Sequence, residues 1–287
     1  MRFLKVAPAV IVASFAQYWP EIAMTEATVR LEQRETVALL TLARPAQRNA
    51  ISEALLDELD AALDRIPAAT RAIVLAGEGP HFCAGLDLKE HHGKARSGVE
   101  FMRVCQRWHR TFDKLQYGGL PVIAALHGAV VGGGLELAAA THIRIADPNT
   151  YFALPEGTKG IFTGGGATVR VARIVGAGRM VEMMLTGRVL DAHAGLALGL
   201  AHEICDTGAA LETALATAAR VAQNAALSNY AMVTSIARIG DMSATDGMFA
   251  ESLMAAVVQT GPEVQSRLGS FVNKTLPKVA PGPGIAR

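Results

Sequence analysis

Apolar residues along the first part of the chain follow two different spacings. Residues 29–33 alternate apolar and polar side chains at first, and residues 37–42 are a short run rich in leucine; the two segments are predicted to be strands joined by a turn. In residues 53–66 the leucines recur at helical spacing after Ser52, a good helix cap, which predicts an amphipathic helix. The chain is therefore expected to begin strand, strand, helix.

The same order continues toward the middle of the chain. Residues 72–76 are all apolar and end at Gly77, which is typical of a strand buried on both faces. A polar loop follows over residues 81–87, then a predicted helix over 99–114 and a strand over 122–126. This alternation predicts an α/β fold with stacked parallel strands.

Beyond about residue 209 the apolar spacing is helical only. Four helices are predicted there, over residues 209–224, 229–240, 246–259 and 262–272. We therefore divide the chain into a core domain (25–208) and a C-terminal helical oligomerisation region (209–287), in which the proline-rich tail 277–287 is expected to be loose. The all-helical end favours a closed symmetric oligomer.

Residues 1–24 form an extension in front of this plan. Their short basic start and the apolar run over 6–16 fit a signal peptide, whereas Met24 is an alternative start just before the first strand. We expect a tail or a misassigned start. A cleaved targeting peptide and an added helix are the alternatives.

Composition limits the class of protein. With 51% hydrophobic and 18% charged residues, the 287-residue chain can bury a substantial core. The net charge of +1 gives no reason to expect nucleic acid or a membrane as partner. The three cysteines, at 83, 105 and 205, have no metal-ligand spacing and suit a reducing compartment, so we expect a cytoplasmic protein without a metal site.

Two glycine triplets stand near two carboxylates in the middle of the chain. Gly132, Gly133 and Gly134 run directly into Leu135-Glu136-Leu137 and three alanines, so a helix is predicted to start at about Gly133. The unpaired N–H groups of a first helical turn can stabilise a developing negative charge. Tight helix packing is the alternative reason for the glycines.

The two carboxylates are Glu136 and Glu156, twenty residues apart (156 − 136). A carboxylate among leucines and alanines is costly to bury unless it is paired or used chemically. An ordinary salt-bridged glutamate is the alternative. Glu156 follows Pro155 and is itself followed by the second triplet at residues 164–166.

These motifs resemble the crotonase (enoyl-CoA hydratase/isomerase) superfamily over about residues 29–274. Leu-Ala-Arg-Pro at 42–45 with Asn-Ala at 49–50 is similar to that family's first loop. His81 to Leu88 (HFCAGLDL) is similar to its first oxyanion segment, and residues 132–137 (GGGLEL) to its second. The resemblance implies an α/β crotonase-type spiral of ββα units whose C-terminal helices form a trimer, or a hexamer made of two trimers.

The resemblance also implies a thioester of coenzyme A as substrate, with no metal or redox cofactor. Its thioester oxygen would be held by the N–H groups of Leu86 and Gly133. The substrate-binding candidates are Ala84 beside the adenine, Arg48 and Lys274 near the phosphates, Gly132 in the glycine-rich turn, and Gly164, whose N–H would hold a water.

Glu136 and Glu156 stand where the family's hydratases carry their two glutamates. By this analogy Glu136 activates the water and Glu156 exchanges the Cα proton, which favours a hydratase of short 2-enoyl-CoA thioesters of fatty acid metabolism. Thr163 and Leu154 depart from the residues common in the family, so the acyl group stays open, and a methylthioacryloyl-CoA-like substrate is one candidate. An enoyl-CoA isomerase and, from a different class, a non-catalytic binding or assembly protein are the alternatives.

Overall fold

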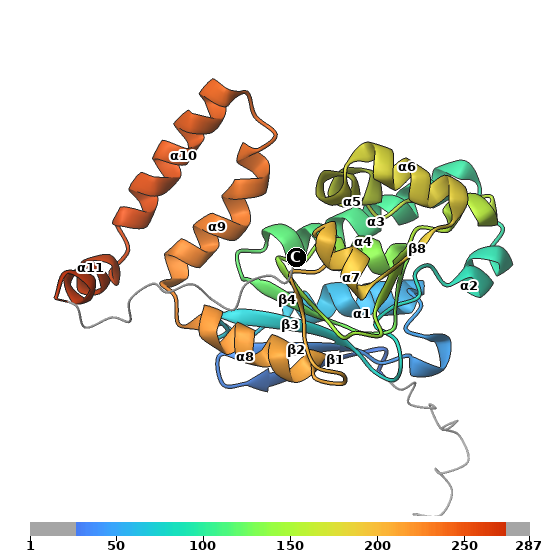
Figure 1. Cartoon of the computed structure of the whole chain (residues 1–287), viewed down its shortest axis with the longest axis horizontal. Helices are drawn as coiled ribbons and strands as arrows, with labels where there is room; N and C mark the ends of the chain where they lie inside the picture. The colour runs from blue at the N-terminus through green and yellow to red at the C-terminus, as the bar shows by residue number, and fades with distance from the viewer. Residues whose placement is uncertain (1–26, 274–287) are drawn as a thin grey trace, which may run out of the picture.

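The computed structural model describes residues 27–273 and contains one large sheet. The predictions for residues 1–24, the tail 277–287 and Lys274 lie outside the described residues. The large sheet has the spatial order β1 (Val29–Arg34), β2 (Val37–Leu42), β3 (Ala72–Gly77), β4 (Val122–Leu126), β6 (Ile143–Ala146) and β9 (Glu203–Ile204). The first pair is antiparallel and the rest are parallel, so the predicted α/β class is confirmed (Figure 1).

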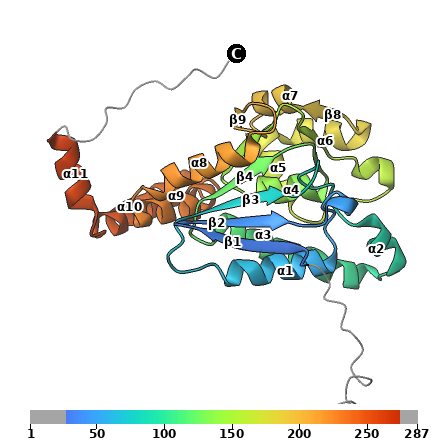
Figure 2. The same ribbon diagram turned by 90° about the horizontal axis from the view of Figure 1, so that it is seen from below.

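Helices cover both faces of this sheet, which explains why β3 and β4 are apolar throughout. On one face, Leu40, Leu75 and Ala124 join a core with α1 (Glu53–Asp64) and α3 (Gly98–Tyr117). On the other face, alternate strand residues pack against α8 (Ala210–Ala222), whose buried alanines let the helix lie close to the strands (Figure 2). The first of the four C-terminal helices is thus part of the sheet's covering.

A second, smaller sheet stands beside the first. It has the order β5 (Ala129–Val131), β7 (Tyr151–Ala153) and β8 (Val189–Asp191). The intervening segments form a group of short elements: α2 (Leu88–Gly93), α4 (Gly133–Ala139), α5 (Ala167–Val175), α6 (Ala177–Thr186), α7 (Ala192–Ala197) and the 3-10 turns η1 (Pro45–Gln47) and η2 (Glu156–Lys159). The predicted helix start at Gly133 is confirmed.

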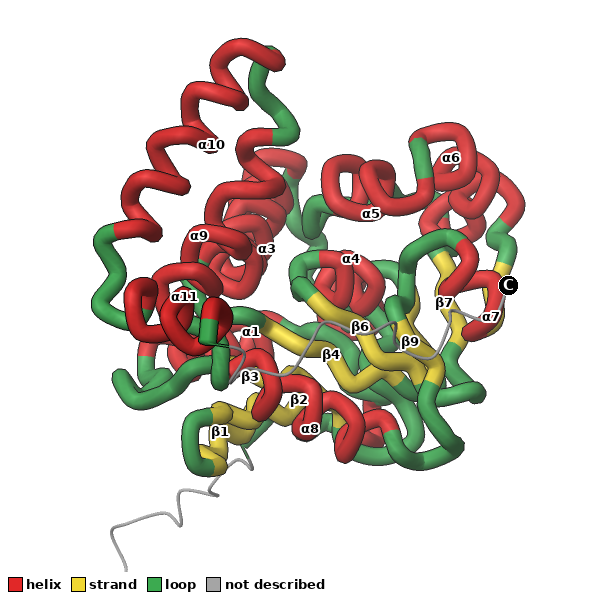
Figure 3. The backbone as a smooth tube through the Cα atoms, turned by 60° about the vertical axis from the view of Figure 1, so that its left-hand side comes forward, coloured by secondary structure: helices red, strands yellow, loops and turns green. Residues whose placement is uncertain are grey.

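The last three helices are α9 (Ala226–Ile239), α10 (Ala244–Gln259) and α11 (Val264–Val272). The helix α10 packs beside α9, and this pair stands away from the sheets (Figures 1 and 3). All four predicted C-terminal helices are therefore present, with ends displaced by at most a few residues. Within residues 27–273, no helix combines the length and the apolarity that crossing a membrane requires.

Candidate active site

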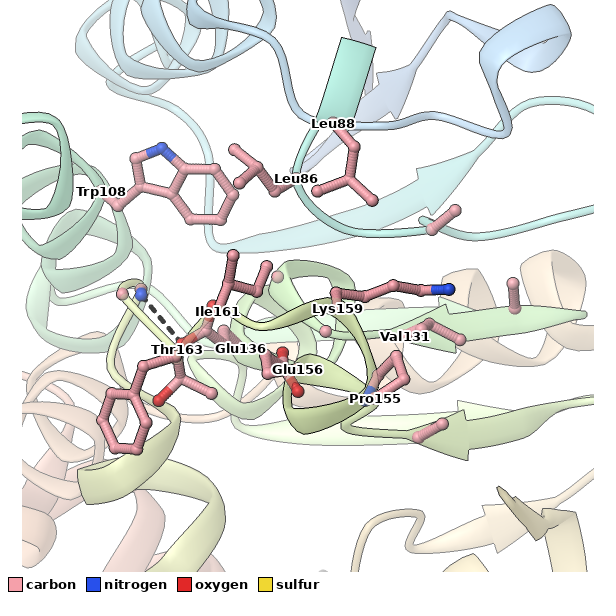
Figure 4. A pocket seen from close by; sticks show the side chains of 18 of the residues that line it. Leu86, Leu88, Trp108, Val131, Glu136, Pro155, Glu156, Lys159, Ile161 and Thr163 are labelled. Carbon is pink, nitrogen blue, oxygen red and sulfur yellow. Dashed lines mark hydrogen bonds between the residues drawn. The ribbon is translucent and has the colours of Figure 1, made fainter. Parts of the chain in front are cut away.

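A cavity of about 470 Å³ opens between the first loop, the segment after β3, α3, and the short elements around α4. Every sequence-predicted site residue within the described chain lines it or reaches into it: Arg48, Ala84, Leu86, Gly132, Gly133, Glu136, Glu156 and Gly164. Figure 4 shows Glu136 and Glu156 on the same side of this cavity, with Leu86 and Trp108 across from them. The structure thus collects residues from positions 48 to 164 in one place.

The backbone of Leu86 lies next to Gly133. Ile51 pairs with this segment by donating to the Gly85 carbonyl and accepting from the Asp87 N–H, which leaves the Leu86 N–H facing the other way. A Cβ added at Gly133 would lie 3.3 Å from the Leu86 nitrogen. Since Gly133 is the first residue of α4, its own N–H precedes the helical hydrogen-bond pattern. Two amide donors therefore stand side by side at the cavity.

Loops hold this arrangement through a buried asparagine. Asn49 accepts from the Arg44 N–H (2.9 Å) and donates to the carbonyls of Glu78 (2.9 Å) and His81 (2.7 Å). The Ala84 N–H donates to the Arg48 carbonyl, so the first loop and the Leu86 segment are joined directly. This explains why the Leu-Ala-Arg-Pro and Asn-Ala motifs occur together.

Glu136 is held by the start of the next helix. Its side chain is on α4, the residue is only 3% exposed, and Oε1 accepts from the N–H groups of Gly165 (2.8 Å) and Ala167 (2.9 Å). Burial raises the pKa of Glu136, while these two N–H groups and the nearby Arg170 guanidinium act against that rise. One donor from the second glycine triplet and one from the first residue of α5 therefore anchor this carboxylate.

Glu156 has a different environment. It opens η2, is 6% exposed, and its Oε2 has no hydrogen-bond partner within residues 27–273. Burial, and to a lesser degree the negative charge of Glu136, raise the pKa of Glu156 to about 7. A Cβ added at Gly132 would lie 3.1 Å from Oε1, so the glycine leaves room beside this carboxyl. Near neutral pH the arrangement favours one protonated and one ionised glutamate.

Sequence reasoning missed three residues that shape the cavity. Trp108 on α3 lies against two glycines, since an added Cβ would come within 2.5 Å of its ring at Gly133 and 2.8 Å at Gly165. Arg170 stands behind the turn that holds Glu136, and Lys159 lines the cavity three residues after Glu156. The pattern around Trp108 and Arg170 is that of ordinary amphipathic helices, which gives no signal of a site.

The charged groups of the cavity include two cations. Within residues 27–273, the ion pairs of the structure involve neither Arg48 nor Lys159. In the same part of the chain, no group of three or more His, Cys, Asp and Glu side chains is arranged to hold a metal ion. The cavity therefore combines backbone donors, a carboxyl pair and two unpaired positive charges.

This fold and this cavity match known proteins. The profile of the enoyl-CoA hydratase/isomerase family matches residues 32–279. The 2,3-dehydroadipyl-CoA hydratase of Escherichia coli (strain K12) is 32% identical over 256 residues, covering 88% of this chain and 98% of that protein. The mitochondrial Delta(3,5)-Delta(2,4)-dienoyl-CoA isomerase of Dictyostelium discoideum is 27% identical over 263 residues, covering 87% and 90%.

A crystal structure gives the same result in three dimensions. The protein from Rhodopseudomonas palustris CGA009, provisionally named an enoyl-CoA hydratase, superposes with a TM-score of 0.83 at 45% identity, covering 86% of this chain and 95% of that one. The chain belongs to the enoyl-CoA hydratase/isomerase family and has the α/β crotonase fold, with two sheets and C-terminal helices. It is an enzyme of that family, and membership implies an acyl-CoA substrate.

Proposed function

We propose that the protein is a hydratase that adds water across the 2,3 double bond of a short 2-enoyl-CoA thioester. The observation that carries the proposal is the unequal pair of glutamates on one cavity. Glu136 is anchored by two backbone N–H groups, and Glu156 carries an unpaired oxygen and a pKa raised to about 7. Addition of water needs one group that accepts a proton and another that delivers one.

In this mechanism a water molecule attacks Cβ while Glu136 accepts its proton. The electrons of the double bond move toward the thioester oxygen, where the N–H groups of Leu86 and Gly133 stabilise the enolate. Glu156 then delivers its proton to Cα, and a proton exchange between the two carboxyls and solvent restores the starting state. Each acid–base contribution is worth about 10²–10⁴ in rate, and each oxyanion donor about 10²–10³.

The remaining candidate residues are assigned around the same substrate. Ala84 would lie beside the adenine of coenzyme A, and Arg48, with Lys274, near its phosphates. Gly132 leaves room for the Glu156 carboxyl, and the Gly164 N–H would help to hold the attacking water. These roles are supported by the position of each described residue in the cavity wall.

The acyl group faces an apolar part of the cavity. Trp108, Ile161 and Phe162 line it, together with Thr163, which replaces the proline common in the family. We infer a short, uncharged acyl group; a sulfur-bearing acryloyl thioester of the methylthioacryloyl type fits the same description. The Escherichia coli relative is named for a dehydroadipyl thioester, so a dicarboxylic acyl group belongs in any substrate panel.

An isomerase is the second candidate, since the Dictyostelium relative carries that name. Moving a double bond needs one acid–base group that shuttles a proton, and Glu156 alone can supply it. The anchoring of Glu136 favours the hydratase, because an isomerase leaves this buried carboxylate without a chemical role.

Product mass distinguishes the two candidates. A panel of enoyl-CoA thioesters is incubated with the protein, and the products are weighed by mass spectrometry. The hydratase adds one water, and both Glu136→Gln and Glu156→Gln abolish this addition. A product of unchanged mass makes the protein an isomerase, and full turnover by Glu136→Gln disproves the two-carboxylate mechanism.

We also propose that the helices α9 and α10 assemble three copies of the chain into a trimer, which can pair to a hexamer. Exposed apolar side chains gather on this pair: Ile236 (67% exposed), Met248 (66%), Phe249 (66%) and Leu253 (53%). A groove between the two helices adds further apolar surface. Surfaces of this kind mark contacts between subunits.

Light scattering tests the assembly. Ile236→Glu and Phe249→Glu are expected to lower the molar mass from that of the oligomer to that of one chain. Met102→Glu, on α3 and also exposed, is the matched control and leaves the mass unchanged. An oligomer that survives both substitutions contradicts the proposal.

The three cysteines are free thiols in the structure, which supports the inference of a cytoplasmic protein.

A further inference from the structure

Arg170, on α5, lies directly behind the turn that anchors Glu136. The residue is 8% exposed, and its Nη1 donates to the Gly165 carbonyl at 3.1 Å. The same guanidinium fills the space next to Gly166, where an added Cβ would collide with it and where φ is +107°. Position 166 therefore requires glycine, because the guanidinium occupies the space that a side chain there would need.

The other two nitrogens of Arg170 reach α3. Nη2 lies 2.5 Å from Oδ1 of Asp113, and Nε donates to Oε1 of Gln116 at 2.6 Å. A planar guanidinium with several fixed donors suits such a junction, because its geometry leaves little freedom to either side. Arg170 thus ties the turn that holds Glu136 to the helix that carries Trp108.

Arg170 also supplies positive charge next to Glu136. The charged and titratable groups that face this carboxyl are Arg170 from α5, Glu156 from η2 and Cys105 from α3. Asp113 lies on the far side of the guanidinium, with a half-exposed side chain. Burial raises the pKa of Glu136, and the charge of Arg170 acts against that rise.

We propose that Arg170 is a positioning residue for hydration, which fixes the turn that grips Glu136 and keeps Glu136 the ionised member of the carboxyl pair. This inference rests on the proposed hydratase function. It assigns the unequal roles of the two glutamates to one side chain that touches neither the substrate nor the oxyanion donors. Among residues 27–273 no cation forms an ion pair with Glu156, so this carboxyl is left to carry the proton.

The charge and the positioning can be separated by two substitutions. Arg170→Met removes both, so kcat is expected to fall about 10²-fold. The acid limb of the kcat/KM profile, where Glu136 becomes protonated, is expected to move up by about one pH unit. Arg170→Lys keeps the charge but loses the fork of donors, so its kcat falls about tenfold while the acid limb stays in place. Arg170→Gln is a second variant without the positive charge. It is chosen because a glutamine amide, unlike a methionine side chain, is a hydrogen-bond donor that could replace the bond to the Gly165 carbonyl.

The matched control is Arg173→Met on the same helix. Arg173 pairs with Asp241 at 2.7 Å, is half exposed, and is outside the cavity lining, so kcat and the pH profile stay those of the wild type. The inference is overturned if a folded Arg170→Met or Arg170→Gln keeps the wild-type acid limb, or if Arg170→Lys shifts that limb as far as they do. If the wild type and Arg173→Met add no water to any enoyl-CoA, the proposed function itself fails, which is a different result.

Discussion

Glu136 and Glu156 face one cavity from unequal hydrogen-bonding environments. Oε1 of Glu136 accepts two backbone N–H groups, whereas Oε2 of Glu156 has no partner among the residues that the structure describes. Buried polar groups in folded proteins almost always find partners, and an unsatisfied one marks a position kept for another purpose. The carboxyl of Glu156 is therefore expected to lower the stability of the fold.

Replacing this carboxyl should stabilise the protein in a pH-dependent way. The pKa of Glu156 rises from 4.5 to about 7 on folding, so the folded state favours the protonated form. Below pH 4.5 Glu156 is protonated in both the folded and the unfolded state, so its carboxyl does not reduce the free energy of unfolding. This free energy falls as the pH rises from 4.5 to about 7, and the full destabilisation is present above pH 7. A tenfold change in proton affinity corresponds to about 1.4 kcal/mol, so the penalty is on the order of 3 kcal/mol.

Thermal unfolding of Glu156→Gln and wild type at pH 5 and pH 8.5 measures this effect. The variant is expected to be the more stable protein at pH 8.5, with the difference shrinking toward pH 5. Glu182→Gln, a surface carboxylate that pairs with Arg179 and Arg188, is the control and shows no such gain. A Glu156→Gln variant that is less stable than wild type at pH 8.5 contradicts the interpretation of Glu156 as an unsatisfied group.

The same group should set the alkaline limb of activity. In the proposed mechanism Glu156 delivers a proton to Cα. The value of kcat/KM for a short enoyl-CoA is therefore expected to decline above about pH 7, where this carboxyl ionises in the free enzyme. The two carboxyls interact, so the apparent pKa of each limb also includes the effect of the other carboxyl. Initial rates between pH 5 and pH 9.5 measure the profile, and a constant kcat/KM up to pH 9.5 contradicts the assignment.

The sequence predicts the parts of this site that local chemistry marks. Glu136 and Glu156 stand out because their neighbours are apolar, and Gly133 because three glycines precede a helix-forming run. Arg170 could not be predicted in the same way, since its partners Asp113 and Gln116 lie more than fifty residues away along the chain. Only the packed fold shows that its positive charge lies near Glu136.

The helices and strands also differ in how well the sequence predicts them. Long periodic segments such as α1 and α3 are predicted within a few residues, while the three-residue strands β5, β7 and β8 are too short to show a period. The helix α9 begins at Ala226 rather than 229, because Asn229, a residue typical of turns, is buried inside it and donates to the Val221 carbonyl at 2.9 Å. Tertiary contacts override local preference at that position.

Gly133→Ala should damage catalysis while the fold survives. The added Cβ would lie 2.5 Å from the Trp108 ring and 3.3 Å from the Leu86 nitrogen, so the start of α4 or the Trp108 ring must shift and the alignment of the two amide donors is disturbed. We expect kcat to fall about 10²-fold. Gly178→Ala on α6 is the control: no heavy atom lies within 4 Å of its added Cβ, and helical alanine stabilises by about 0.5–1 kcal/mol. Wild-type kcat in Gly133→Ala contradicts the assigned oxyanion site.

Trp108 should limit the length of the acyl group. Trp108 is 5% exposed, and its ring lies against Gly133 and Gly165, beside the proposed oxyanion site. Trp108→Ala opens space there for a longer acyl chain. The ratio of kcat/KM for an eight-carbon enoyl-CoA to that for a four-carbon one is expected to rise about tenfold, the lower end of what one methylene group contributes in an apolar pocket. Phe112→Leu is the control, because Phe112 packs behind Trp108 outside the cavity. An unchanged ratio in Trp108→Ala contradicts this role.

Arg48 and Lys159 should act on the phosphates of coenzyme A rather than on the acyl group. Both line the cavity without an ion-pair partner in residues 27–273, and Figure 4 shows the Lys159 side chain extending away from Trp108 and Thr163. Arg48→Met and Lys159→Met are each expected to raise KM for an enoyl-CoA about fivefold at low salt, the range of one exposed charge pair, and less at high salt. With an N-acetylcysteamine thioester, which has no phosphate, neither substitution should change KM.

Lys89→Met, an exposed lysine on α2 outside the cavity, is the control. If Lys159→Met impairs turnover of the truncated thioester as strongly as that of the full one, its ammonium serves the acyl group, and a dicarboxylic substrate becomes the better assignment.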